Sequence, residues 1–255
     1  RLTGLALANL KRLDLEKRQQ TLESDLNAAR KAQQLLMPPS SGVLGSVSYA
    51  VVMRPGRYVA GDLFDIVPLK DGRVGVFLGD VSGKGVGAAI LMTSAQTHLR
   101  MALQQTGDPA QAVMLTNPHI AARSGEGRFI SLWIGVIDPA AGTVTFVDAG
   151  HGHWLARPVD GPAKGGMLLG IDEEAVYENE VLELPPGSRL LLYSDGVFEQ
   201  TDPQGEQFGL DRIVNALVET DGPARDVESL FGAVVSFAAG ASLADDVTVA
   251  SVRMG

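Results

Sequence analysis

The sequence comprises 255 residues, 45% of them hydrophobic, with no cysteine and a formal net charge of −9. The lack of cysteine excludes disulfides, zinc–thiolate sites and cysteine nucleophiles, and the acidic balance disfavours nucleic-acid binding, which depends on Lys and Arg. No apolar run reaches the roughly 18 residues that a membrane-spanning helix needs, so we expect no membrane segment in this chain.

The first predicted element is a helix over residues 1–37, a stretch that has no proline and almost no β-branched residues. Its residues recur at alternating spacings of four and three, as in a coiled-coil seam. The seam consists of Leu22, Leu26, Ala29, Gln33 and Leu36. The "MPPSSG" segment at 37–42 ends the helix, because proline cannot continue it. We therefore expect a helical linker over 1–40 that forms a homodimer, and one domain over 41–255. The chain begins at Arg1 rather than Met, so we expect it to be a piece of a longer protein with an upstream sensor domain.

After the linker the pattern changes to short strands rich in Val, Ile and Phe. The predicted strands are 47–55, 63–69, 73–81, 129–139, 143–150, 176–184, 189–196 and 246–254, and the predicted helices are 86–105, 109–123, 209–219 and 224–240. The turns "KDG" at 70–72 and "PAAG" at 139–142 join neighbouring strands as hairpins. Strands in hairpin-linked groups favour an α+β domain in which two antiparallel sheets pack face to face with helices outside.

The glycine-rich stretch "FLGDVSGKGVGAAIL" at 77–91 follows a strand and opens a helix. A nucleotide P-loop is excluded by spacing, and because Gly85 rather than Ser or Thr follows Lys84. A dinucleotide fingerprint is matched by "GKGVGA" at 83–88, but the acidic residue expected about 20 residues later is missing. In a third interpretation Asp80 is the functional residue. The strand presents its carboxylate at the sheet edge, and the glycines let the backbone turn around a ligand.

Further aspartates stand at the edges of predicted strands. They are Asp62, Asp195, Asp245 and Asp246. Each alone is typical of a turn or a helix cap. Gathered in one place they would repel one another, and divalent cations would remove that cost. All-oxygen ligands favour Mg²⁺ or Mn²⁺ over zinc or copper.

Five motifs, in order, resemble the SpoIIE/RsbU-type branch of the PP2C (PPM) serine phosphatases. They are "RPGRYVAGDLFD", "GDVSGKGVGAAIL", "FISLWIGVIDPAAGTVTFVDAGH", "LLLYSDGVFEQTDPQGEQFG" and "DDVTV". The resemblance covers about residues 45–253, and "ARKAQQLLMPP" is similar to the family's linker helix. It implies a PP2C-like αββα sandwich with two metal ions, Mn²⁺ or Mg²⁺, in the cleft between the sheets.

The resemblance also implies roles for individual residues. Asp62 and Asp80 would be the bridging or first-metal ligands, and the backbone carbonyl of Val81 would add another oxygen. Asp195 and Asp245 would complete the shell of the second metal. Asp65 and Asp246 are adjacent candidates, and Lys84 is a candidate phosphate contact. His151 and His153 are given no role. The chain departs from the family pattern in having Ala60-Gly61 where the family has two glycines.

The function implied is that of a metal-dependent protein serine/threonine phosphatase in the bacterial cytoplasm. Its expected substrate is a phosphorylated STAS-domain anti-sigma-factor antagonist in a partner-switching stress response. Two alternatives remain: a catalytically inactive relative that binds a partner through the same fold, and a nucleotide-binding protein that uses "GKGVGA".

Overall fold

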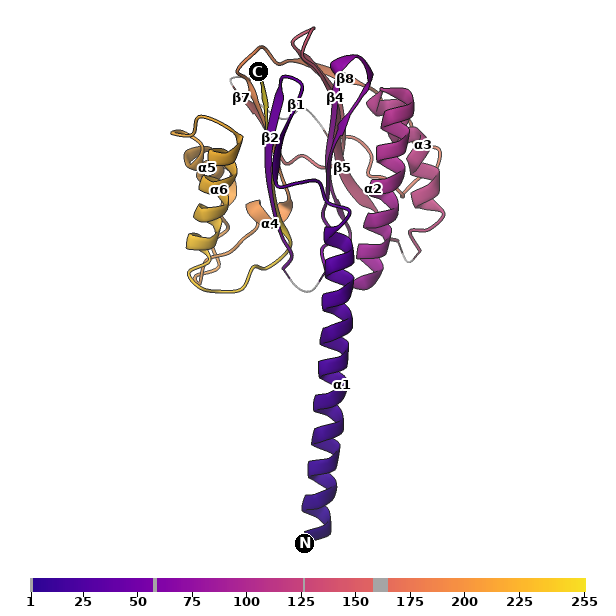
Figure 1. Ribbon diagram of the computed structural model, residues 1–255, viewed down its shortest axis with the longest axis vertical. Helices are drawn as coiled ribbons and strands as arrows, with labels where there is room; N and C mark the ends of the chain where they lie inside the picture. Colours follow the sequence, from indigo (N-terminus) through magenta and orange to yellow (C-terminus); the bar gives the residue numbers. More distant parts are fainter. Residues whose placement is uncertain (1, 57–58, 126, 158–164) are drawn as a thin grey trace.

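The computed structural model describes residues 2–56, 59–125, 127–157 and 165–255. Over these residues the chain forms two five-stranded antiparallel sheets that face each other, with helices on both outer faces and one long helix standing away from them (Figure 1). The predicted α+β sandwich is confirmed.

The first sheet has the strand order β1-β2-β10-β9-β7. Its strands are β1 (Ser41–Leu44), β2 (Val47–Arg54), β7 (Trp154–Arg157), β9 (Arg189–Tyr193) and β10 (Val247–Met254). The start of β10 lies beside the end of β9, since Val249 pairs with Tyr193. The residues that precede β10 and those that follow β9 therefore emerge at one edge of the sheet.

The second sheet has the order β3-β4-β5-β6-β8. Its strands are β3 (Leu63–Pro68), β4 (Val74–Val81), β5 (Ile130–Asp138), β6 (Thr143–Ala149) and β8 (Glu180–Glu183). Both predicted hairpins are confirmed: β3 pairs with β4 around a 3₁₀ turn at Lys70–Gly72, and β5 pairs with β6. Because Leu63 pairs with Gly79, the start of β3 and the end of β4 share an edge.

Helices cover the outer faces of the sandwich. In Figure 1, α2 (Val86–Thr106) and α3 (Pro109–Ala121) lie over the second sheet, and α5 (Gly209–Ala216) and α6 (Pro223–Phe237) over the first. Side chains along β3 alternate between the two layers that it separates. Phe64 and Ile66 pack between the sheets, whereas Leu63 and Val67 pack under α2.

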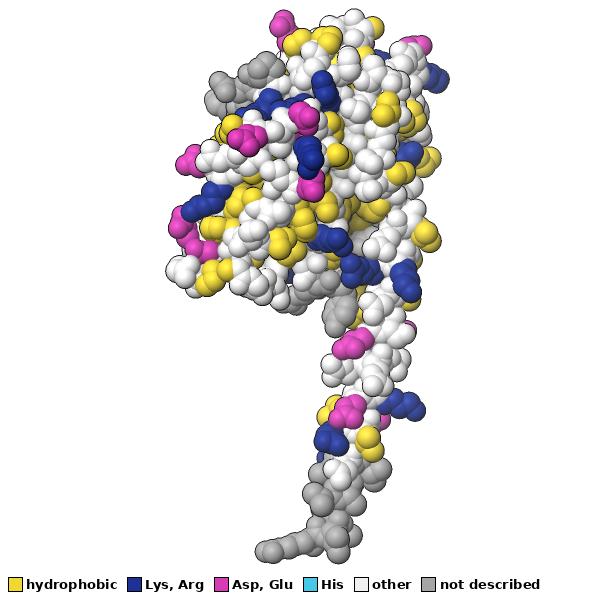
Figure 2. All heavy atoms as spheres, turned by 60° about the vertical axis from the view of Figure 1, so that its left-hand side comes forward, with side chains coloured by type: hydrophobic (Ala, Val, Ile, Leu, Met, Phe, Trp, Pro, Cys, Tyr) yellow, Lys and Arg dark blue, Asp and Glu magenta, His cyan; other side chains and the backbone are white. Residues whose placement is uncertain are grey.

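The long helix α1 (Leu2–Gln34) extends away from the sandwich, and Figure 2 shows basic and acidic side chains interspersed along it. Several of its leucines are exposed, with Leu13 at 55%, Leu15 at 66% and Leu22 at 59%. Of the predicted seam, Gln33 contacts the sandwich: its amide donates to the Ala60 carbonyl at 2.8 Å and accepts from the Ala60 N–H at 3.1 Å. Among the described helices, none combines the length and the hydropathy that a membrane crossing would require.

Three short elements were not predicted. They are β1, β7 and the single-turn helix α4 (Asp195–Phe198). In addition, the predicted strand 176–184 is reduced to the four residues of β8. The remaining predicted strands and helices all occur, with shifted ends.

Candidate functional site

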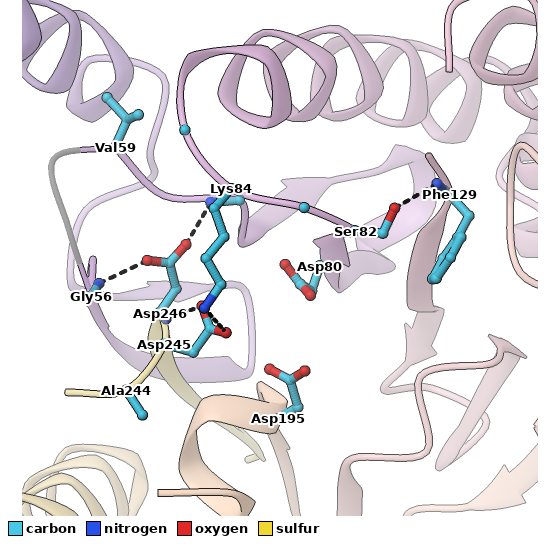
Figure 3. Close-up of a pocket in the computed structure, with 13 residues that line it drawn as sticks. Gly56, Val59, Asp80, Ser82, Lys84, Phe129, Asp195, Ala244, Asp245 and Asp246 are labelled. Carbon is cyan, nitrogen blue, oxygen red and sulfur yellow. Dashed lines mark hydrogen bonds and ion pairs between the residues drawn. The ribbon is translucent and has the colours of Figure 1, made fainter. Parts of the chain in front are cut away.

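A pocket of about 260 Å³ opens where the edges of the two sheets meet the start of α2 (Figure 3). Acidic side chains from separate segments line it: Asp80 in β4, Asp195 at the start of α4, and Asp245 and Asp246 directly before β10. Lys84, in the glycine-rich turn between β4 and α2, lines the same pocket. The antiparallel pairings described above thus gather aspartates that are far apart in the sequence.

Asp62 and Val81 lie beneath this pocket, at the shared edge of β3 and β4. Both are almost fully buried, at 1% exposure. The Asp62 carboxylate accepts a hydrogen bond of 2.5 Å from the hydroxyl of Thr248 in β10. Asp62 therefore bridges the two sheets, whereas Asp80 reaches the pocket itself.

Gly61 marks the point where the predicted oxygen ligands converge. A methyl group on this residue would lie 3.1 Å from Asp80 Oδ1 and 3.2 Å from the carbonyl oxygen of Val81. The space beside Gly61 is thus a small cradle of oxygen atoms that any larger side chain would crowd. The Ala60-Gly61 departure from the family pattern keeps glycine at this crowded position.

Two further glycines fix the acidic pair before β10. The backbone of Asp245 and Asp246 lies between Gly56 on one side and Gly196 on the other, and a methyl group on either glycine would collide with it. Close packing of Gly196 against this backbone brings Asp195 beside Asp245. The glycine that follows Asp195 in "SDG" is therefore required by packing.

Burial and like charge raise the pKa values of these carboxyl groups. Burial, followed by the negative charges of Asp195, Asp245 and Asp246, raises the pKa of Asp80 to about 7. Burial, followed by Asp80 and Asp246, raises the pKa of Asp62 well above its ordinary value, while the Thr248 hydroxyl lowers it. A cation at this place would relieve the repulsion among the ionised groups.

The two members of the "DD" pair have different surroundings. Asp245 forms an ion pair of 2.7 Å with the ammonium group of Lys84. Asp246 accepts backbone hydrogen bonds from Gly56 at 2.8 Å and from Gly61 at 2.6 Å, one on each carboxylate oxygen (Figure 3). Asp246 therefore anchors the loop that leads to Asp62, whereas Asp245 faces the open pocket.

Asp65 does not join this group. Its carboxylate lies on the face of β3 that packs against α2, where Arg100 donates to both oxygens at 2.7 Å. Alternation along β3 explains its position, because Asp65 shares the face of Leu63 and Val67. The structure therefore gives Asp65 an ion-pairing role away from the pocket.

The two unassigned histidines lie near the pocket without lining it. His151 is buried, and its Nε2 lies 3.1 Å from the Tyr193 carbonyl oxygen. Burial, followed by the neighbouring His153, lowers the pKa of His151 to about 3. His151 is therefore neutral, and it donates to the carbonyl from Nε2. It ties the loop after β6 to β9.

The sequence interpretation missed the hydroxyl groups that connect the acidic segments. Thr248 stands within the quoted "DDVTV" motif, and Ser194 directly precedes Asp195. The Ser194 hydroxyl donates to the Asp246 carbonyl at 3.1 Å and accepts from the Thr248 N–H at 2.9 Å. The sequence did contain a signal for Thr248: it is a polar residue inside an otherwise apolar predicted strand, beside an acidic pair.

The residues present suit a hard divalent cation in two respects: the donors are oxygen atoms, and the cradle at Gly61 brings a carboxylate and a carbonyl to one place. In the described part of the chain, however, no three carboxylate or imidazole groups stand close enough together to hold an ion as they lie. The acidic residues thus surround a common space without forming a closed ligand shell.

The nucleotide-binding alternative meets a topological obstacle. Its "GKGVGA" segment does lie between β4 and α2. However, β4 pairs antiparallel with both β3 and β5, so the parallel βαβ unit of a dinucleotide fold is missing here.

Comparison with known families and proteins identifies relatives of this chain. Residues 70–255 match the family described as Stage II sporulation protein E (SpoIIE). Protein IcfG of Synechocystis sp. is 30% identical over 76% of this chain, which corresponds to 35% of IcfG. Phosphoserine phosphatase RsbU of Bacillus subtilis is 26% identical over 77% of this chain and 60% of RsbU. The chain thus spans about a third to three fifths of the length of these relatives.

Solved structures share the fold. The SiaA-PP2C domain of Pseudomonas aeruginosa superposes with a TM-score of 0.82 at 21% identity, over 93% of this chain and 99% of that domain. The catalytic domain of serine threonine protein phosphatase PstP, in complex with two manganese ions, gives a TM-score of 0.62 at 18% identity, over 81% of this chain and 97% of that one.

Proposed function

The chain belongs to the SpoIIE family of PP2C-type protein phosphatases, and we propose that it hydrolyses phosphoserine or phosphothreonine in a protein substrate with two bound Mn²⁺ or Mg²⁺ ions. The observation that supports this most directly is the gathering of Asp80, Asp195 and Asp245 around one pocket, with Asp62 directly beneath. The manganese ions of the PstP structure are consistent with the choice of cation.

In this proposal Asp62, Asp80 and the Val81 carbonyl hold one ion, and Asp195 and Asp245 the other. When bound, the ions would activate a water and neutralise the charge that develops on the phosphoryl oxygens. Asp246 holds the loop of Gly56 and Gly61 in place, through the backbone hydrogen bonds described above. Gly56, Val59 and Gly61, together with the glycine-rich turn before α2, line the pocket.

Lys84 is proposed to contact the substrate phosphate. Its ammonium group lies at the pocket, within 2.7 Å of Asp245. A flexible ammonium group can exchange a carboxylate partner for a phosphoryl oxygen without any change in the backbone.

We further propose that the substrate is a phosphorylated STAS-domain anti-sigma-factor antagonist and that the protein acts in the cytoplasm. Membership of the family and the similarity to RsbU support a place in a partner-switching pathway. Residues 1–40 would then be a linker that joins two copies and transmits the state of an upstream sensor to the domain at 41–255. The inactive-relative alternative is less well supported, because the proposed metal-binding aspartates are all present.

The proposal is tested by phosphate release from a phosphoserine STAS protein. We expect turnover with added Mn²⁺, loss of turnover with EDTA, and recovery when Mn²⁺ is restored. The matched control is the same assay with Zn²⁺ alone, which should not restore the activity. Full turnover in EDTA, or recovery with zinc but not with manganese, would contradict the two-metal proposal.

A further inference from the structure

Thr248 occupies an unusual place for a hydroxyl side chain. It is the second residue of β10 and is 1% exposed. The strand is otherwise mostly apolar at this end, with Val247 and Val249 both fully buried in the core under the helices. A buried hydroxyl needs a hydrogen-bond partner, and for Thr248 this partner is the Asp62 carboxylate at 2.5 Å.

The backbone of Thr248 is fixed independently of this contact. Its N–H donates to the Ser194 hydroxyl at 2.9 Å, and its carbonyl accepts from the Ser194 N–H at 3.0 Å. Ser194 therefore extends the pairing of β9 and β10 beyond Tyr193, at the point where the chain turns into Asp195. As a result the Thr248 hydroxyl is held by a rigid backbone when it meets Asp62.

These contacts connect three segments that each contribute acidic residues to the site. Thr248 reaches Asp62 through its side chain, Ser194 through its backbone, and the "DD" pair through its own strand. From this arrangement we propose that Thr248 is a positioning residue: its hydroxyl fixes the rotation of the Asp62 carboxylate so that Asp62 can serve as a metal ligand. This inference rests on the proposed function, since it assigns Asp62 to a metal site.

A carboxylate ligand that loses its outer hydrogen-bond partner is held less firmly in its ligating orientation, and its affinity for the metal falls. Loss of such a partner usually weakens metal binding about 10- to 100-fold. A merely structural threonine would instead affect folding and leave the affinity of the folded protein unchanged.

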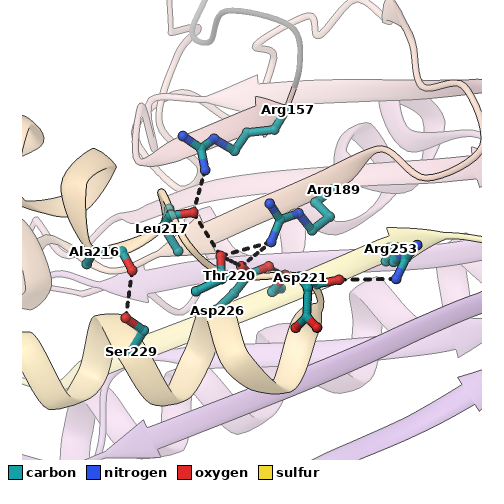
Figure 4. Close-up of polar contacts among 10 residues, drawn as sticks. Arg157, Arg189, Ala216, Leu217, Thr220, Asp221, Asp226, Ser229 and Arg253 are labelled. Atoms are coloured by element: carbon teal, nitrogen blue, oxygen red, sulfur yellow. Dashed lines mark hydrogen bonds and ion pairs between the residues drawn. The ribbon is translucent and has the colours of Figure 1, made fainter.

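The chain offers a matched control on the same strand. Ser251 is also fully buried in β10, and its hydroxyl donates to a buried carboxylate, that of Asp226, at 2.6 Å. Asp226 lies at the start of α6, where it also accepts from Arg189 and Thr220 (Figure 4). This network ties α6 to the first sheet, and none of its four residues lines the acidic pocket.

The experiment is calorimetric titration of MnCl₂ into the full chain and its variants, with folding checked by circular dichroism. Thr248→Val should bind Mn²⁺ about 10- to 100-fold more weakly than the wild type, and Thr248→Ser should recover most of the affinity. Ser251→Ala should melt at a lower temperature but bind Mn²⁺ like the wild type. With p-nitrophenyl phosphate, Thr248→Val should need more Mn²⁺ for half-maximal rate at an unchanged KM. If Thr248→Val fails to fold, Ser194→Ala provides the test, with a smaller loss of affinity expected.

Equal Mn²⁺ affinity in the wild type and folded Thr248→Val would overturn the inference while leaving the proposed function intact. The inference would also be overturned if Thr248→Ser failed to recover affinity, or if Ser251→Ala lost as much affinity as Thr248→Val. A wild-type chain that binds no Mn²⁺ would overturn the proposed function, and the inference with it.

Discussion

Asp80 lies among like charges, and its proposed role as a metal ligand implies a conflict between stability and ligand binding at this residue. Burial and the charges of Asp195, Asp245 and Asp246 all oppose its ionised form. Asparagine has nearly the same shape and removes one of the charges. In EDTA we therefore expect Asp80→Asn to unfold at a higher temperature than the wild type, by about 2–4 °C for each kcal/mol of relieved repulsion.

With Mn²⁺ present the order should reverse. If Asp80 holds an ion as proposed, the wild type will gain stability from the bound ions, whereas Asp80→Asn will lack one ligand and gain less. Its phosphatase turnover should be almost abolished. Glu173→Gln is the control, because Glu173 is exposed and its substitution removes the same charge without touching the pocket. Near-normal turnover of Asp80→Asn at saturating Mn²⁺ would show that Asp80 is not a ligand.

The lowered pKa of His151 predicts how the stability of the protein depends on pH. This pKa is about 3 in the folded protein, below the ordinary value of about 6.5. Well above pH 6.5 the group is neutral in both states and has no effect. Below that, the unfolded chain binds a proton that the folded chain excludes, so stability is lost as the pH falls, by roughly 2 kcal/mol between pH 7.5 and pH 5.

The measurement is urea unfolding of the wild type and His151→Gln at several pH values. Glutamine retains an N–H donor for the Tyr193 carbonyl but does not titrate. The wild type should lose more stability than the variant on acidification, and carboxyl groups common to both proteins cancel in the difference. Parallel pH curves would show that the pKa of His151 is the same in the folded and unfolded states, which would contradict the expected shift.

At the scale of elements, hydrophobic runs and turn chemistry predict most of the sheets. The strands rich in Val and Ile, and the "KDG" and "PAAG" hairpins, are confirmed. The short strands β1 and β7 have only four residues each, too few for a period-two pattern to be recognised. They are strands because longer neighbours, β2 and β9, provide hydrogen-bond partners, which is tertiary information.

The candidate site, too, is predicted by local sequence patterns only in part. An aspartate at the end of a predicted strand and beside a glycine is expected to face a site, and Asp80 and Asp195 do line the pocket. Which strand edges coincide depends on sheet order, and sheet order is not contained in local patterns. Asp65 lies away from the pocket because it shares the face of Leu63, which packs under α2. Thr248 went unassigned because its partner Asp62 belongs to the other sheet.

Helix α1 shows how one residue can fit two patterns. Gln33 falls on the heptad seam, yet its amide binds both polar groups of the Ala60 backbone. Ala60 is followed by Gly61 and Asp62, so the last turns of α1 hold the loop that leads into the site. A displacement of α1 would therefore act on the position of Asp62 through this contact.

On the scale of the whole molecule, α1 leaves several apolar side chains exposed to water. Leu22 is 59% exposed on a helix that extends well beyond the sandwich (Figure 1). Isolated helices are marginally stable, and a seam against a second copy would bury these leucines. We expect the full chain to dimerise through α1, as judged by light scattering over a concentration series.

Two substitutions separate dimerisation from coupling to the site. Leu22→Glu should shift the equilibrium towards monomer, whereas Ser24→Glu, which adds the same charge off the seam, should not. Gln33→Ala should leave dimerisation nearly unchanged but release Ala60, so the Mn²⁺ concentration for half-maximal turnover should change. A monomeric wild type would end the proposal of a dimerising helix, and an unchanged manganese requirement in both Leu22→Glu and Gln33→Ala would reduce α1 to a passive tether. A change in Gln33→Ala alone would locate the control at the contact between α1 and the loop before Asp62, because this contact joins the helix to a segment that leads directly to a proposed ligand.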